Sequence, residues 1–234
     1  FTATVTGATG ALSPAGTMSW SISGQASACA ITAGTAPGLS ATQTIFTCPV
    51  NAARAGAYTA VATYGGDTNY TALAATAPLS ITVQKAAPLI TLAGSGTGAL
   101  SGNLVFTATV TGSSGAIAPT GSITWTLTGT SGVTACTTTP TSTTLGIVTT
   151  FICNVTATSY GSYIASAVYS GDTNYLTVTS NSVALGISLV TPTISIAVSS
   201  SPTLGSLATL TTIVTGPAGG SKPGGTMGWT VTNP

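Results

Sequence analysis

The stretch FTATVTG decides the fold: it occupies residues 1–7 and returns unchanged at residues 106–112. In the second copy Phe106, Ala108 and Val110 have one parity, and threonines fill the positions between them. Side chains of a β-strand alternate between two faces, so this pattern predicts a strand with one core face and one solvent face. Threonine and valine are branched at Cβ and favour extended backbone. The stretch therefore indicates an all-β protein.

Other motifs return at the same spacing of about 105 residues. DTNY occupies residues 67–70 and 172–175, and Trp20 has counterparts at Trp125 and Trp229. Such a period fits a whole β-sandwich domain and is too long for one turn of a solenoid. We therefore expect a repeat that lacks its first strand at 1–85, a complete repeat at 86–190 and the truncated start of a third at 191–234. We also expect a longer tandem array, or ends completed by a neighbouring subunit.

Short alternating runs predict about seven strands in each copy, separated by Gly, Pro, Asn and Ser. The clearest runs lie at residues 44–50, 58–64, 79–83, 89–92, 106–111 and 123–128. Seven short strands in about 100 residues are typical of a two-sheet sandwich.

Two motifs recur in register. One is a strand that begins with Pro and ends on Trp, at 14–20, 119–125 and 223–229. The other has the pattern GxYxxxAxYxGDxNY, at 56–70 and 161–175. Together they resemble the bacterial Ig-like domains that occur in tandem in large extracellular surface and filament proteins. The resemblance covers essentially the whole chain, and it implies tandem immunoglobulin-like sandwiches arranged as an extended rod. The disulfide of antibody domains has no counterpart, because neither FTATVTG nor the strand at 58–64 carries Cys.

The four cysteines fall two to a copy. We expect the disulfides Cys29–Cys48 and Cys136–Cys153, each joining a Gly- and Thr-rich loop to the following strand. The alternative is free buried thiols; two Cys in each copy without His are too few ligands for a metal site. Disulfides imply an oxidising compartment, so we expect a secreted protein, extracellular or on the cell surface.

The scarcity of charged residues excludes most kinds of catalytic and binding site. The chain has three Lys or Arg, two acids and no His, which makes 2% charged residues and a net charge of +1. Acid–base catalysis at neutral pH, a Ser-His-Asp triad and a carboxylate pair all need side chains that are missing. We therefore expect no enzyme activity and no cofactor or metal. A single net charge cannot neutralise a row of phosphates, which argues against nucleic acid. Mean hydropathy is +0.54, but Thr, Ser, Gly and Pro interrupt every apolar stretch, so membrane insertion by this segment is not expected.

The remaining recurrent residues have structural interpretations. Tryptophans in the Pro-to-Trp strand are expected in the core, with a carbohydrate-stacking platform as the alternative; they are Trp20, Trp125 and Trp229. Tyrosines that open the GxY strand are expected to tie the preceding loop with their hydroxyls; they are Tyr58 and Tyr163. The tight turn of the GDxNY motif is assigned to Asp67, Asn69, Asp172 and Asn174. One carboxylate in each copy is too little negative charge for a Ca²⁺ site.

These features favour a structural protein: an extracellular filament, stalk or adhesin shaft. A neutral surface lacks the like-charge repulsion that keeps proteins apart, so we expect self-association into a filament or a lateral bundle. The alternative is a carbohydrate- or host-surface-binding module of an adhesin. Binding copies should differ in loop aromatics or charges, whereas the loops here carry Ala, Gly, Ser and Thr.

Overall fold

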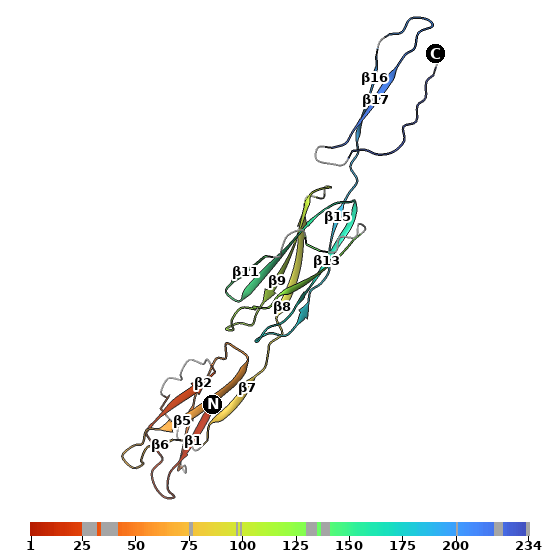
Figure 1. The fold of residues 1–234 in the computed structure, drawn as a ribbon. Coiled ribbons are helices and arrows are strands. Elements are labelled where there is room, and N and C mark those ends of the chain that lie inside the picture. The colour runs from red at the N-terminus through yellow and green to blue at the C-terminus, as the bar shows by residue number, and fades with distance from the viewer. Residues whose placement is uncertain are drawn as a thin grey trace.

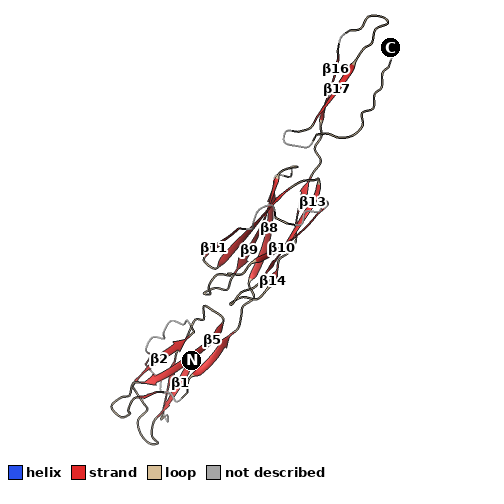
Figure 2. Cartoon of the chain, viewed as in Figure 1, coloured by secondary structure: helices blue, strands red, loops and turns tan. Residues whose placement is uncertain are grey.

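A computed structural model describes residues 1–24, 32–33, 42–74, 77–96, 98, 100–129, 135–136, 141–199, 201–217 and 222–232. All regular secondary structure in these residues is β-strand (Figure 2). The predicted all-β class is thereby confirmed. None of the described segments forms a helix long and apolar enough to cross a membrane.

The middle unit, residues 86–190, contains two antiparallel sheets. Its strands are β8 (Leu89–Gly96), β9 (Asn103–Thr111), β10 (Ile123–Gly129), β11 (Thr141–Leu145), β12 (Val148–Thr156), β13 (Gly161–Tyr169), β14 (Val178–Thr179) and β15 (Val183–Ile187). One sheet has the order β11-β12-β9-β8, and in the other β13 pairs with β10, β14 and β15. The two sheets give this unit a sandwich-type architecture.

The core of the middle unit follows from alternation along its long strands. Every second residue of β9 is buried, with Phe106, Ala108 and Val110 all at 0% exposure. Strand β12 repeats the pattern, and so does β13, where Ala165 and Ala167 are buried. These side chains form one cluster between the sheets. The FTATVTG pattern therefore packs as its parity predicts, with threonines on the other face.

The first unit, residues 1–85, shares most of its strand pairing with the middle unit. Its strands are β1 (Thr2–Thr6), β2 (Thr17–Ser23), β3 (Thr32–Ala33), β4 (Gln43–Thr47), β5 (Gly56–Tyr64), β6 (Leu73–Ala74) and β7 (Leu79–Val83). Strand β5 pairs with β2, β6 and β7, as β13 pairs in the middle unit, and β1 pairs with β4. However, β3 pairs with β2, whereas β11 of the middle unit pairs with β12. The buried cluster is smaller here and centres on Met18, Phe46, Ala62 and Tyr64.

In the third unit, residues 191–234, the described residues form one hairpin of β16 (Thr193–Val198) and β17 (Leu210–Thr215). The strand expected at 223–229 is not formed within described residues 222–232. Trp229 is 49% exposed, so the core position predicted for it is wrong in this structure. The physical reason is that no second sheet packs against the hairpin in the described part of this unit. Figure 1 shows the three groups of strands in chain order, with the hairpin and the N-terminal strands at opposite ends.

Candidate functional site

The first unit has an open sheet edge beside β1. In the middle unit β9 lies between two partners, β12 and β8. Its counterpart β1 pairs with β4 on one edge, and no described strand pairs with its other edge. An unpaired edge presents N–H and C=O groups that can bind another strand.

An apolar cavity of about 140 Å³ lies along this open edge. Its walls come from β1, β2, β5 and β6, and include Ala3, Val5, Met18, Ala62, Tyr64 and Leu73. The cavity thus lies between the two sheets of the first unit, where a sandwich would normally place side chains.

Strand β8 fills the same place in the middle unit. Its inward residues Ile90 and Leu92 are only 8% and 7% exposed. They lie opposite Val110 and Ala108 of β9, whose counterparts in the first unit are Val5 and Ala3 in the cavity wall. Ile90 and Leu92 thus occupy, in the middle unit, the place that corresponds to the cavity of the first unit.

No described strand covers β7 either. Leu79 is 54% exposed and Ile81 is 47% exposed. Their counterparts by strand pairing are Val183 and Leu185 of β15, which pack against the core. Strand β8 covers them, because a Cβ added at Gly94 would lie 2.9 Å from Val183. At the open edge of the first unit, the residues of β1 and those of β7 thus both present apolar side chains.

Strand β16 resembles β8 in sequence. The sequence PLITLAG at 88–94, which contains most of β8, corresponds to PTISIAV at 192–198. Ile194 and Ile196 occupy the positions of Ile90 and Leu92, yet they are 60% and 68% exposed. An apolar face on one strand and an empty apolar edge on another thus occur in the same chain.

The first and middle units meet at a hydrogen-bonded junction. The Ala55 amide donates to Asn174 Oδ1 (3.0 Å), and the Ile117 amide donates to the Ala53 carbonyl (3.2 Å). Lys85 Nζ donates to the Asp172 carbonyl at 2.5 Å. Asn174 is buried, whereas its counterpart Asn69 in the first unit is exposed. The turn residue Asn174 therefore also holds two units together.

The linker itself joins the middle unit. Ala86 forms a parallel bridge with Tyr175, with one bond from the Ala86 amide to the Asn174 carbonyl (3.0 Å) and another from the Leu176 amide to Ala86 (2.9 Å). Pro88 follows two residues later and restricts φ. Because both the amide and the carbonyl of Ala86 are hydrogen-bonded to the middle unit, the linker is held against that unit.

Asp172 organises the turn of the middle unit. Its Oδ1 accepts the Asn174 and Tyr175 amides at 2.7 and 2.9 Å. Its Oδ2 accepts the Thr120 amide (2.7 Å) and the Tyr169 hydroxyl (2.7 Å). Burial raises the pKa of Asp172, but these hydrogen bonds, that from Thr120 first, outweigh it and lower the pKa to about 2. The carboxylate thus ties the Pro-to-Trp segment to the GDxNY turn.

Asp67 makes the corresponding bonds in the first unit. It accepts the amides of Asn69 and Tyr70 at 2.7 and 2.8 Å, and the Tyr64 hydroxyl and Ala15 amide at 2.6 Å. The bond from Tyr64 is the main reason that its pKa falls well below the ordinary value. The sequence indicated the turn but not these bonds to the tyrosine and the Pro segment.

The tyrosines that open the GxY strands tie the preceding loops, as the sequence suggests. The Tyr58 hydroxyl donates to the Arg54 carbonyl (2.9 Å), and the Tyr163 hydroxyl donates to the Ser159 carbonyl (3.0 Å). Both rings are buried.

The last tyrosine of the motif has a role that the sequence analysis missed. The Tyr175 hydroxyl donates to the Ile117 carbonyl (2.7 Å), and its ring lies against Gly112, where a Cβ would collide with the hydroxyl. Tyr70 and Gly7 repeat this contact. The glycine that ends both copies of FTATVTG was the signal that could have found it.

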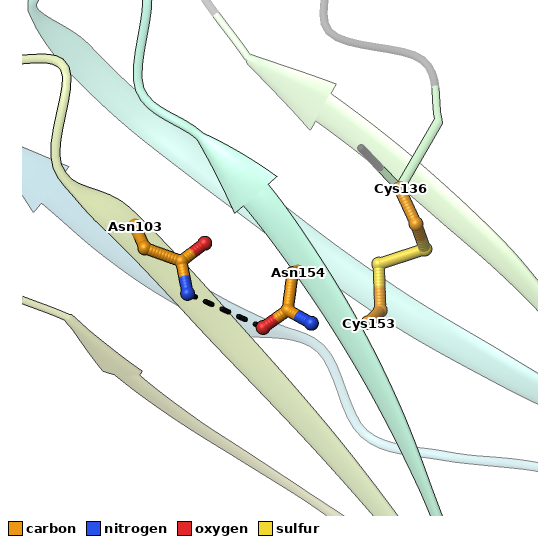
Figure 3. The surroundings of a disulfide bond; sticks show 4 residues. All are labelled: Asn103, Cys136, Cys153 and Asn154. Atoms are coloured by element: carbon orange, nitrogen blue, oxygen red, sulfur yellow. Dashed lines mark hydrogen bonds between the residues drawn. A yellow bond between two sulfur atoms is a disulfide. The ribbon is translucent and has the colours of Figure 1, made fainter. Parts of the chain in front are cut away.

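A disulfide joins Cys136 to Cys153, with Cα atoms 5.4 Å apart (Figure 3). Cys153 is fully buried in β12, so the bond attaches the segment around Cys136 to the core. Beside it, Asn103 Nδ2 donates to Asn154 Oδ1 at 3.3 Å. Cys48 is also disulfide-bonded; its expected partner Cys29 lies outside the described residues.

Trp20 and Trp125 are half-buried and pack against the cores of their units. Their indole Nε1 atoms are buried without a hydrogen-bond partner in the described structure. A stacking platform for sugar needs an open ring face, so the packing favours the core role for these two residues.

The described residues hold no group of three His, Cys, Asp or Glu side chains that could bind a metal ion. No protein-family model, curated protein or solved structure matches this chain. The candidate site is therefore defined by its own geometry: an open apolar edge, an exposed apolar strand and an ordered junction between units.

Proposed function

We propose that this chain is an extracellular structural repeat protein without catalytic activity, which associates with itself into a filament. Its sandwiches are immunoglobulin-like domains in this proposal, and they follow one another as an extended rod. The single observation that carries the proposal is the junction between the first and middle units.

A rod needs junctions that resist bending. Here the Ala55 amide donates to Asn174 Oδ1, the Ile117 amide to the Ala53 carbonyl and Lys85 Nζ to the Asp172 carbonyl. Within the middle unit, backbone bonds hold the linker residue Ala86 beside Tyr175, where it leads to the first unit. Inter-domain contacts of this kind limit relative motion more than a flexible linker does.

The disulfide supports the proposed location outside the cell. The Cys136–Cys153 bond is stable in an oxidising compartment and is rare in the cytosol. It supports a secreted protein, and it attaches Cys136 to the buried Cys153 of β12.

The surface favours association without ion pairs. With 2% charged residues the chain has almost no like-charge repulsion and few charged side chains to protect its sheet edges. Contacts between copies should therefore be apolar and hydrogen-bonded, and salt should change them little.

Sedimentation of the purified, unglycosylated chain over a range of salt concentrations tests this proposal. We expect assemblies whose size grows with protein concentration and is nearly the same at low and high ionic strength. A monomer under all conditions would contradict self-association. Dissociation by salt would contradict contacts between copies that are formed without ion pairs. A monomer that binds an immobilised glycan would instead favour the alternative of an adhesin binding module.

A further inference from the structure

We propose that the outer edge of β11, in the middle unit, is a lateral interface that pairs antiparallel with β11 of a second copy of this chain. The inference rests on the proposed self-association and adds a sideways contact to it. The interface is symmetric, because each copy contributes the same strand, Thr141–Leu145, around a two-fold axis.

The edge of β11 is open in the described structure. Strand β11 is the outermost strand of its sheet and lies at the lateral margin of the middle unit (Figure 1). It pairs with β12 on one side, and no described strand pairs with its other side. All residues of β11 are exposed, including Ser142 and Thr144, whose partners Phe151 and Thr149 are buried. The described residues therefore leave room for a second strand on both faces of the sheet.

The opposite edge of the same sheet is covered. There the Leu92 amide of β8 donates to Asn181 Oδ1 at 3.3 Å. A Cβ added at Gly94 of β8 would lie 2.9 Å from Val183, so β15 packs against this strand. Strand β11 has no comparable cover among the described residues.

Strand β11 also lacks the features that protect exposed sheet edges. Its sequence TSTTL contains no charged residue and no proline, and its register with β12 continues without a bulge. Folded proteins protect their edges with such features because a bare edge binds another strand. The edge of β11 thus has the properties of a strand that pairs with a partner.

The hairpin loop fixes which backbone groups face the open edge. Leu145 and Val148 flank a two-residue loop and form a hydrogen-bonded pair, and such pairs alternate along an antiparallel ladder. The hydroxyls of Thr144 and Thr149 are 3.2 Å apart, as expected for a non-hydrogen-bonded pair. The backbone groups of Ser142 and Thr144 therefore point away from β12, and their amides have no hydrogen-bond partner in the described structure.

One register satisfies these groups in both copies. Ser142 of each copy lies opposite Thr144 of the other, and each of these equivalent pairs exchanges both N–H···O=C bonds. Thr143 then lies on the two-fold axis, opposite its own counterpart. Thr141 lies opposite Leu145 of the second copy. This register uses every outward N–H and C=O group of Ser142 and Thr144.

The side chains match in the same register. Thr143 belongs to a row of threonines that crosses the outer face of the sheet, through Thr150 and Thr109 to Thr91. In the proposed interface this row meets the same row of the second copy. Opposed threonines stabilise paired strands, and none of the four strands carries a charge that pairing would bury. A second copy therefore fits this edge in charge as well as in hydrogen bonding.

Leu145 adds an apolar contact at each end of the interface. It is 86% exposed, more than any other large apolar residue in the described part of the middle unit. In the paired strands it lies beside Thr141 of the second copy, so part of its side chain is removed from water.

The contact is small and gains strength by repetition. A single pair of short strands buries less surface than a stable dimer needs. In a filament the contact recurs with every copy, and linked contacts strengthen one another through avidity. The two-fold axis joins neighbouring filaments that run in opposite directions, while each filament stays polar. Association along the filament and association sideways thus use different surfaces.

A single cysteine variant tests the symmetry and the register. Opposed residues of a non-hydrogen-bonded pair have Cα atoms about 4.5 Å apart, within the range of a disulfide. We therefore expect T143C chains to form a covalent homodimer under mild oxidation, with the bond mapped to position 143. No described native cysteine is free to compete.

T141C is the matched control, because Thr141 is exposed on the same face of the same strand. In the proposed register the two copies of position 141 are four residues apart, about 13 Å. We expect at least about ten-fold less homodimer from T141C than from T143C. A mixture of T141C and L145C chains should cross-link as T143C does. Equal homodimer yields from T143C and T141C would overturn the proposed register.

Charge at the two-fold axis provides an independent test. Thr143→Lys places two ammonium groups directly opposite each other, which destabilises paired strands. We expect electron micrographs to show single filaments for this variant and paired filaments for the parent. A mixture of Thr143→Lys and Thr143→Glu chains should restore the pairs.

Thr91→Lys is the control for added charge. Thr91 is exposed and belongs to the same row of threonines, but it lies on β8, at the opposite edge of the sheet. This variant should form paired filaments like the parent. Paired filaments of Thr143→Lys alone would overturn the proposal.

The outcomes separate this inference from the proposed function. Single filaments of the parent, together with T143C chains that do not cross-link, would overturn the lateral interface and leave the filament function standing. A monomeric parent and no cross-linking of T143C would overturn both. Cross-linked T143C dimers without any filament would support the interface and contradict the proposed filament.

Discussion

Replacing Asp172 by Asn tests how strongly one carboxylate holds a unit together. The change keeps the size of the side chain but replaces one oxygen by an NH2 group. Asp172 Oδ1 accepts two amides of the turn, while Oδ2 accepts the Thr120 amide and the Tyr169 hydroxyl. In the variant, the NH2 group of the new asparagine side chain must face one of these two pairs of hydrogen-bond donors. The Thr120 amide can only donate, so it cannot form a hydrogen bond to that NH2 group.

The magnitude can be estimated in two ways. The pKa of Asp172 falls from 3.8 to about 2; at about 1.4 kcal/mol for each pKa unit this would be roughly 2–3 kcal/mol, and solvent screening of this half-buried carboxylate reduces it to about 1 kcal/mol. Loss of a charge-assisted bond with an unsatisfied amide left behind costs about 1–3 kcal/mol. We therefore expect the free energy of unfolding of the middle unit to fall by about 1–2 kcal/mol at pH 7.

The sign of the pH dependence provides a second test. A carboxyl with a lowered pKa in the folded state stabilises the protein above its unfolded pKa, and the stabilisation is lost as the pH falls through the folded pKa. For Asp172 that window runs from about pH 4 to pH 2. The difference between parent and variant should therefore shrink across this window.

Hydrogen exchange of the amides in β10 and β13 is the appropriate assay, because the chain has several units and one global midpoint would mix them. Asp67→Asn is the matched control: it should loosen β2 and β5 and leave β10 and β13 unchanged. Unchanged exchange in Asp172→Asn at pH 7, or a difference that persists at pH 2, would contradict this role of the Asp172 carboxylate.

Three further predictions concern the disulfide, the tryptophans and pH. Cys153→Ser should destabilise the middle unit by about 3 kcal/mol, because the bond closes a loop with a separation of 17 residues; mass analysis of the parent should find no alkylatable Cys153 thiol before reduction. Trp125→Ala should cost about 3 kcal/mol in chemical denaturation, whereas Trp229→Ala, at a 49% exposed position, should change stability by less than about 0.5 kcal/mol; equal effects would contradict the assigned packing. Stability should be nearly constant from about pH 4 to 10, since the chain has no His and only two acids. Above pH 10 it should fall, because burial and the bond to Asp172 raise the pKa of Tyr169 to about 12 and the folded state resists its ionisation; a transition near neutral pH in thermal melts would contradict this.

The sequence predicted the parts of the fold that alternation controls. The parity of Phe106, Ala108 and Val110 indicated their buried face, and the run at 79–83 coincides with β7. Alternation identifies a strand because it depends only on local geometry. The exposure of Trp229 could not be predicted in this way. Burial of its side chain requires a second sheet packed against it, and alternation along one strand does not reveal whether that sheet is present.

The candidate site lay beyond sequence reasoning for a different reason. A first repeat without its first strand could be inferred from the position of FTATVTG, but the exposure of Leu79 and the cavity beside Val5 depend on three strands meeting in space. The bond from Ala55 to Asn174 likewise joins residues 119 apart. Long-range contacts of this kind leave no periodic signal in the chain.

Electron microscopy of the purified chain at neutral pH tests the central proposal most directly. We expect polar filaments of head-to-tail copies, in which successive sandwiches follow one another along the filament axis. Isolated rods at every protein concentration would contradict the proposed self-association.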